Sequence, residues 1–149
     1  MNQTVELLQR TLENARMGED ACGQLLDKAK NQQMREELMR QATELSRLPL
    51  TTLKLHQLQV VRGTRMAEEY AERPADFHIF AMEDYIETVI DYVERLSPNI
   101  VLERFASQSP KELLIAPDWG LKNHELVDKV KRRMRERSTW QGRLYDKMQ

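Results

Sequence analysis

The run "LKLHQLQVV", Leu53 to Val61, decides the fold, because most of the remaining chain has the periodicity of amphipathic helix. Its alternation predicts a β-strand over residues 53–61. Both faces mix apolar and polar residues, which is typical of a strand in a barrel or central sheet with polar groups near a ligand-binding end. One face would carry Leu53, Leu55, Gln57, Gln59 and Val61, and the other Lys54, His56, Leu58 and Val60.

Two helices are expected before this strand. Residues 4–30 have apolar residues at helical spacing, and we expect Cys22, on that stripe, to be a buried small hydrophobe rather than a reactive thiol. Residues 34–48 form a second amphipathic segment that ends before Pro49, since the residue preceding a proline disfavours helical geometry. Together they predict a helical hairpin over residues 1–48.

After the strand, Gly63 permits a turn and Thr64 can cap a helix over residues 65–72. A strong helix follows at residues 82–96, then a strand in "IVLERFAS" and a third candidate strand in "ELLIAP". We expect the Asp118-Trp119 pair to form a packed turn with its indole in the core rather than a recognition aromatic. A basic helix begins near Lys122.

The predicted fold class is α+β: an N-terminal helical hairpin followed by a small two- or three-stranded sheet packed against helices. Residues 1–48 and 49–149 are expected to form one compact unit, since the length suits a single domain. The expected core comprises Leu53, Leu55, Leu58, Val60, Val89, Val93, Ile100, Leu102 and Ile115.

Composition excludes several classes of site. With a single cysteine, the chain cannot form an internal disulfide or a Cys-rich metal site by itself. No glycine-rich phosphate loop occurs, and the three histidines have no metal-ligand spacing. We therefore assign no catalytic residue and no metal ligand. The N-terminus has no apolar signal core and the chain no long apolar run, so a cytoplasmic protein without membrane contact is expected.

Charge is unevenly distributed along the chain. The net charge is −1, but residues 51–121 carry seven Lys/Arg against twelve Asp/Glu, and residues 122–149 carry nine against four. The basic C-terminal helix could contact nucleic-acid phosphates or simply turn its charge toward solvent.

Three segments carry a resemblance to a known family. "LPLTTLKLHQLQVVRGTRMAEEY", "YIETVIDYVERLSPNIVLERFASQSPKELLIAPDWGLKNHEL" and "RSTWQGRLY" resemble the YhcC-like group of radical S-adenosylmethionine proteins. The element order also looks like the C-terminal extension of the Elongator complex's radical-SAM catalytic subunit. The resemblance covers the chain from about Met34 onward.

The resemblance implies a parent fold in which residues 53–64 include a late strand of a partial α/β barrel. Family members hold a [4Fe–4S] cluster through a CxxxCxxC-type loop and cleave S-adenosylmethionine with it. This chain has only Cys22 and cannot supply three thiolates. We therefore expect no cofactor on this chain and no catalysis by it alone. Two interpretations then remain for His56, Gln57 and Gln59. They are relics of a ligand site whose polar groups now bond to neighbouring backbone, or they retain a binding role.

Three functions remain open from the sequence. The first is a non-catalytic module that binds a protein partner or itself, with Arg62, Glu103 and Arg104 as candidate partner or substrate contacts. For Glu103 and Arg104 the alternative is an ion-paired strand end. The second is binding of RNA, such as tRNA, through the basic helix. The third is radical-SAM activity by complementation with a cluster-bearing chain. The candidate phosphate contacts are Lys129, Arg132, Arg133, Arg135 and Arg137.

Overall fold

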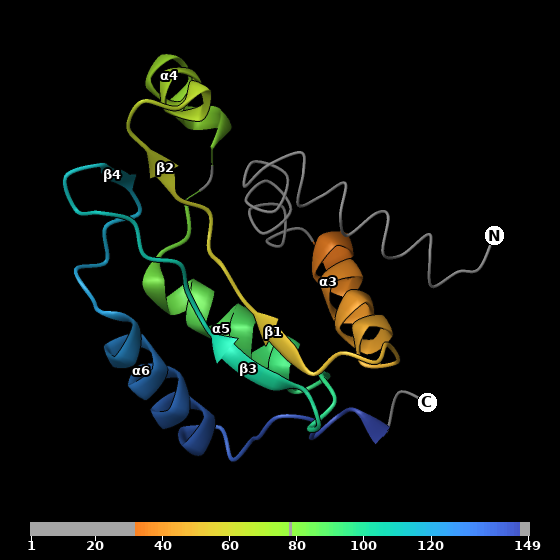
Figure 1. Ribbon diagram of the computed structural model, residues 1–149. Coiled ribbons are helices and arrows are strands. Elements are labelled where there is room, and N and C mark those ends of the chain that lie inside the picture. The colour runs from red at the N-terminus through yellow and green to blue at the C-terminus, as the bar shows by residue number, and fades with distance from the viewer. Residues whose placement is uncertain (1–31, 78, 147–149) are drawn as a thin grey trace.

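The computed structural model describes residues 32–77 and 79–146, and Figure 1 shows its arrangement. The expected helix over residues 4–30, with Cys22, lies outside the described residues. The described elements follow one another as α3 (Gln32–Leu45), β1 (Thr52–Lys54), β2 (Val60–Val61), α4 (Arg65–Glu72), the 3₁₀ turn η2 (Pro74–Asp76), α5 (Met82–Val93), β3 (Val101–Arg104), β4 (Leu114–Ala116) and α6 (Asn123–Glu136).

The helices lie close to the predicted segments because their end signals are local. Thr64 caps α4 as predicted: its side chain accepts a hydrogen bond from the Ala67 backbone N–H at 3.2 Å. Glu83 and Asp84 lie in the first turn of α5, where the helix dipole favours negative charge. The second helix of the expected hairpin is α3. It ends at Leu45, and turns connect it to Pro49.

The strands of the described residues form two separate pairs. β1 pairs with β3 in parallel, and β2 pairs with β4 in antiparallel orientation. The predicted single strand over residues 53–61 is therefore interrupted between Lys54 and Val60, because its two ends pair with different strands. The class remains α+β, as predicted, with helices packed against small sheets.

The main core lies between the helices and one face of the parallel pair. Buried residues of α5 and α6 form it with Phe80 and Ala106, and half-buried Leu55, directly after β1, and Leu102 of β3 pack against it. Of the expected core, Leu58, Val60, Val89, Val93 and Ile100 are buried. Ile115 was predicted wrongly: it is 38% exposed, because among the described residues β4 pairs with the short β2 alone and its Ile115 face is left in solvent.

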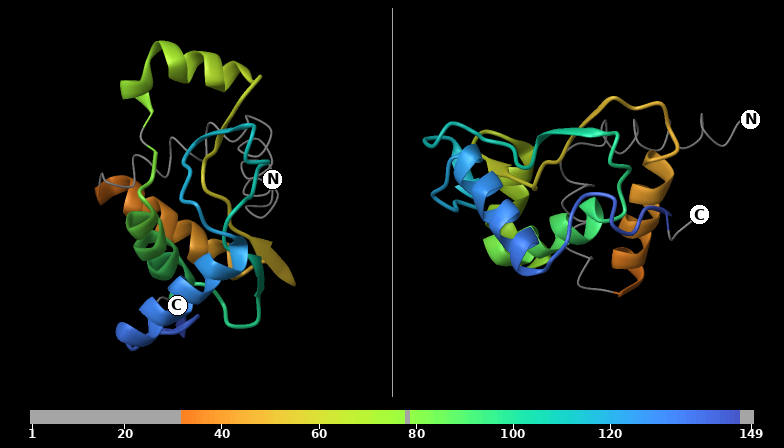
Figure 2. Two further views of the ribbon diagram at one scale, coloured as in Figure 1. Left: turned by 90° about the vertical axis from the view of Figure 1, so that its left-hand side faces the viewer. Right: turned by 90° about the horizontal axis from the view of Figure 1, so that it is seen from below.

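Away from this core, α4 projects from the body formed by α3, α5 and α6, as Figures 1 and 2 show. Neither α4 nor η2 contains a buried residue. The ring of Tyr70 meets that of Phe77 edge-to-face, with centroids 5.5 Å apart. This region therefore packs against β2 and has no buried core of its own.

The C-terminal segment fastens α6 to the end of α5. Gly142 N donates to Val93 O at 3.0 Å and Leu144 N donates to Glu94 O at 2.8 Å. The Gln141 side chain donates to Ser97 O and Ile100 O, each at 2.7 Å. The first two bonds satisfy carbonyl groups at the end of α5, where the helix leaves them without intrahelical partners, and the other two hold the turn that follows.

Candidate functional site

The candidate site is one face of the β1–β3 pair, built by strand alternation. On β1 the exposed residues are Thr52 and Lys54, followed by His56, whereas Leu53 and Leu55 are half-buried. On β3, Val101 and Glu103 are exposed. Lys54 Nζ lies 3.3 Å from Glu103 Oε2 across the strands, so both side chains share this face. We call the set Thr52, Lys54, His56, Val101 and Glu103 the open face.

The open face is polar except for Val101, which is 57% exposed. The opposite face of the pair contacts the main core through Leu55 and Leu102. Parallel sheets are almost always covered on both faces. Among residues 32–77 and 79–146, no other strand joins this pair, and the open face carries exposed side chains throughout.

The structure separates His56 from Gln57 and Gln59. His56 is exposed, whereas both glutamines are buried. Gln57 Nε2 donates to Ser107 O at 2.9 Å, and Ser107 N donates to Gln57 Oε1 at 2.7 Å. The amide of Gln57 thereby continues the pairing between the two chain segments after the backbone ladder ends.

The second glutamine makes a similar but weaker connection. Ser109 Oγ donates to Gln59 Oε1 at 2.8 Å. Both glutamine side chains are therefore engaged by the segment after β3, and their bonds hold the point at which β1 diverges toward β2. We call this point, where Gln57 and Gln59 bond to the segment after β3, the joint. A role of the two side chains in ligand binding stays a prediction.

The remaining predicted contact residues lie at strand ends. Arg62 is exposed directly after β2, and its backbone N–H donates to Leu113 O at 2.7 Å. Arg104 is exposed at the end of β3, and its carbonyl accepts from Leu55 N at 2.8 Å. Glu103 belongs to the open face, so the structure brings Glu103 together with His56 and Lys54 on one surface and leaves Arg62 on the other strand pair.

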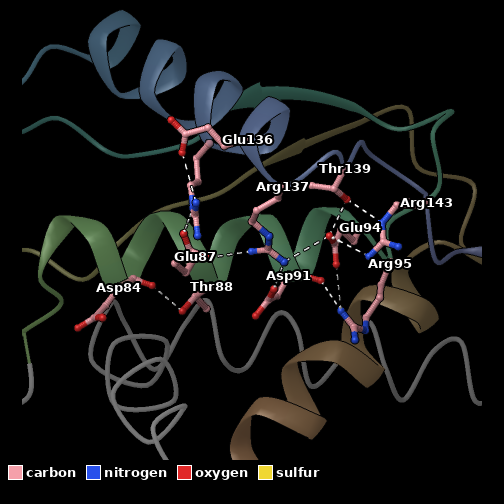
Figure 3. Close-up of polar contacts among 11 residues, drawn as sticks. Asp84, Glu87, Thr88, Asp91, Glu94, Arg95, Glu136, Arg137, Thr139 and Arg143 are labelled. Carbon is pink, nitrogen blue, oxygen red and sulfur yellow. Dashed lines mark hydrogen bonds and ion pairs between the residues drawn. The ribbon is translucent and has the colours of Figure 1, made fainter.

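Two of the five basic residues predicted for phosphate contact are engaged within the protein, and Figure 3 shows one of them, Arg137, beside Asp91 and Glu94. Arg133 of α6 pairs with Glu87 of α5 and with Glu136, and these hydrogen bonds raise the pKa of its guanidinium. Arg137 Nη1 lies 2.9 Å from Glu87 Oε2, and its Nη2 lies 2.7 Å from Asp91 Oδ1. Of the other three, Arg132 and Arg135 are exposed and Lys129 is half-buried.

Sequence reasoning did not identify the buried carboxylate at the centre of this cluster. Glu94 is 3% exposed, and its Oε1 accepts from Thr139 Oγ1 at 2.6 Å, Arg137 Nη2 at 3.3 Å and Arg143 Nη2 at 3.2 Å. Burial opposes the charge of Arg137, but the hydrogen bond to Asp91 and the neighbouring carboxylates raise the pKa of its guanidinium. The sequence contained a signal for this cluster, because helical spacing places three carboxylates on one helix face and two arginines on another. The carboxylates are Glu87, Asp91 and Glu94, and the arginines are Arg133 and Arg137.

The aromatic turn lies against the core, as expected. Trp119 Nε1 donates to Phe80 O at 3.1 Å, and the indole packs 5.2 Å from the ring of Tyr85, centroid to centroid. Asp118 Oδ1 accepts from Gly120 N at 3.0 Å, which closes the turn. The indole therefore has a structural position with its polar N–H satisfied.

The donor groups do not fit the cluster that the resemblance implies. Three thiolates are required at a site-differentiated cluster, and the sequence contains one cysteine. Within the described residues, no group of three His, Cys, Asp or Glu side chains is arranged to hold a metal ion. In that same part of the chain, no helix combines the length and apolar character needed to cross a membrane.

The geometry defines an α+β module in which, among residues 32–77 and 79–146, helices pack against one side of the parallel strand pair. Residues 50–136 match the family model described as the Radical_SAM C-terminal domain, and the chain belongs to that family. The comparison confirms the resemblance given by the sequence.

Two relatives are similar over most of this chain. The uncharacterized protein YtqA of Bacillus subtilis is 25% identical over 115 residues, which cover 77% of this chain and 35% of YtqA. An uncharacterized protein of Methanocaldococcus jannaschii is 31% identical over 108 residues, which cover 72% of this chain and 33% of the relative. The chain thus spans about a third of the length of both relatives. No solved structure gives a significant match.

Proposed function

We propose that this chain is a non-catalytic binding module, derived from the C-terminal region of a radical-SAM protein, that acts through protein–protein contacts. The open face of the β1–β3 pair is the contact surface. A partner chain covers this face and supplies the layer that a parallel sheet requires.

The incomplete parallel sheet is the observation that carries this proposal. An isolated pair of strands is marginal in water, and further strands or packing against a helix stabilise it. Here the covered side is formed by α5 and α6, and the open face exposes Val101 beside the Lys54–Glu103 pair. A surface with one exposed apolar residue among charged groups suits a contact that forms between separately folded chains.

Complementation is a second candidate function, and the chemistry of the open face favours it. His56, Lys54 and Glu103 are titratable side chains on the same surface, next to the carboxyl ends of parallel strands. Ligands of α/β sheets commonly bind at that edge. If the partner carries a cluster, these side chains would lie beside its ligand, and any catalysis would belong to the complex.

RNA binding is less well supported. The ion pairs of Arg133 and Arg137 with α5 use two of the five candidate residues, and a phosphate would have to displace buried or half-buried carboxylates from them. The exposed pair Arg132 and Arg135 remains for phosphate contact. No stacking aromatic lies on α6 to add base recognition.

The experiment is co-expression of this chain with the part of YtqA that lies outside the 115-residue match. YtqA divided at the same point, with its own matched segment supplied as a separate chain, is the positive control. We expect a one-to-one complex by size exclusion with light scattering. A divided YtqA that reassembles, combined with failure of this chain to bind, would contradict the proposal.

Two matched substitutions locate the contact. Val101→Asp places a charge on the open face, and we expect it to weaken the complex by about ten-fold or more. Leu113→Asp changes another exposed apolar residue, 39% exposed before β4, and should leave binding unchanged. Equal loss in both variants would remove the open face as the contact surface.

A further inference from the structure

We infer that the partner adds a strand to the outer edge of β1, so that the two-stranded pair becomes part of a larger sheet. This inference rests on the proposed function and adds a second contact of the same partner, at the backbone edge of β1 beside the open face. The occupant is a strand of the partner chain that corresponds to the part of the longer relatives outside the match.

The direction of the backbone groups identifies the open edge. Val101 N donates to Thr51 O at 2.9 Å, and Leu55 N donates to Arg104 O at 2.8 Å. Residues 51 and 55 therefore direct their peptide groups toward β3. Since successive residues of a strand direct these groups to opposite sides, Thr52 and Lys54 direct theirs away from β3. Within the described residues, no backbone hydrogen bond joins the N–H of either residue to another strand.

The chain order favours β1 over β3 as the receiving strand. β1 is the first strand of the described residues, and strands that follow one another along a chain usually lie side by side in a sheet. In both relatives, about two thirds of the length lies outside the match, and the family is described as a C-terminal domain. A strand from that remaining part is therefore the natural neighbour of β1.

The outer edge of β1 has three features that disfavour pairing with a second copy of this chain. β1 is three residues long, its register with β3 shifts between Leu53 and Lys54, and Lys54 is 54% exposed on it. Short strands, irregular register and edge lysines are devices that limit unspecific strand pairing. A second copy of this chain is therefore a less suitable occupant than a strand with a group that complements Lys54.

The decisive comparison is Lys54→Pro with Lys54→Thr, both measured against the YtqA part outside the match. Both variants remove the lysine charge, but only proline removes the outward N–H. That N–H takes no part in the β1–β3 pairing, and proline is tolerated at edge positions of this kind. We expect Lys54→Thr to weaken binding through the lost charge alone, and Lys54→Pro to bind about ten-fold or more weakly than Lys54→Thr.

Amide hydrogen exchange on the parent chain provides a second measurement that does not depend on folding of a variant. In the free chain, we expect the amides of Thr52 and Lys54 to exchange faster than those of Leu55 and Val101. In the complex, both outward amides should become protected.

The outcomes separate the two proposals. Equal binding by Lys54→Pro and Lys54→Thr, with unprotected outward amides in the complex, would overturn strand addition and leave the open face as a side-chain contact. Absence of any complex, with divided YtqA intact, would overturn the proposed function itself. Dimers of this chain that Lys54→Pro dissociates would identify a second copy as the occupant and overturn the assignment to a partner chain.

Discussion

Thr139 Oγ1 donates a 2.6 Å hydrogen bond to Glu94 Oε1, joining the segment after α6 to the end of α5 across 45 positions of sequence. Arg137 and Arg143 converge on the same carboxylate oxygen, as Figure 3 shows. A buried carboxylate is tolerated only where donors replace its water. The "RSTWQGR" segment supplies these donors and thereby fixes α6, the loop after it and α5 as one unit.

Glu94→Gln should destabilise the protein, because the amide removes the negative charge that faces Arg137 and Arg143. We expect the free energy of unfolding to fall by about 2 kcal/mol, as for loss of charge-assisted hydrogen bonds, measured by urea denaturation. Glu136→Gln is the control, since this exposed carboxylate pairs only with Arg133 in the described contacts and such pairs contribute about 0.5 kcal/mol. Equal effects of both changes would contradict the central role of Glu94.

Gly142→Ala should cost more stability than Gly63→Ala. Both glycines have positive φ, +80° and +82°, so both substitutions incur the left-handed penalty of about 1–2 kcal/mol. At Gly142 an added Cβ would also lie 2.8 Å from Pro98 Cδ and 3.2 Å from Leu96 O, whereas at Gly63 it meets nothing within 4 Å. Thermal melts of the two variants give the difference, and equal melting temperatures would show that the Pro98 contact relaxes freely.

Tyr85 predicts a loss of stability at alkaline pH. Burial raises the pKa of its hydroxyl, which donates to Phe105 O at 2.6 Å. Since the folded pKa exceeds the unfolded value, the contribution is complete below about pH 10 and declines as the pH rises past it. Urea titrations from pH 8 to 11 should show this decline in the parent chain.

Tyr85→Phe should reduce the alkaline decline, although it lowers stability at pH 8 by about 1 kcal/mol through the lost hydrogen bond. Tyr70→Phe is the matched control, because this half-buried hydroxyl on α4 has no hydrogen bond among the described contacts. An unchanged alkaline decline in Tyr85→Phe would assign the effect to another group.

Gln57→Leu tests the joint at which β1 diverges from β3. The substitution removes both hydrogen bonds to Ser107 and leaves a backbone N–H and a carbonyl without them, at a cost of about 1–3 kcal/mol. Gln59→Leu removes one bond to the Ser109 hydroxyl, which can turn to water, so the loss should be smaller. If Gln57→Leu left stability unchanged, the amide would be dispensable for the joint, and a retained ligand role would become the better explanation of its presence.

The sequence predicted the helices well because their signals are local. The Thr64 cap, the apolar periodicity of α5 and the basic face of α6 each lie within one segment. The family resemblance could likewise be recognised from contiguous runs, and the match over residues 50–136 confirms it. Local patterns do not specify partners distant in sequence.

The differences arise where pairing is non-local. The run from Leu53 to Val61 alternates like one strand, but β3 and β4 are different partners for its two ends, and nothing within the run encodes that division. Ile115 belongs to an apolar strand and was expected inside, yet β4 has no layer over that face among the described residues. His56 and Gln57 are neighbours in sequence, and in the segment after β1 the first is exposed whereas the second is buried.

The most direct test of the central claim is size exclusion with light scattering on this chain, alone and mixed with the part of YtqA outside the match. If the open face binds a partner chain, the free protein elutes as a monomer and the mixture contains a one-to-one complex. The Val101→Asp substitution then weakens this complex. A monomer whose elution does not change in the mixture, while divided YtqA reassembles under the same conditions, would contradict the account.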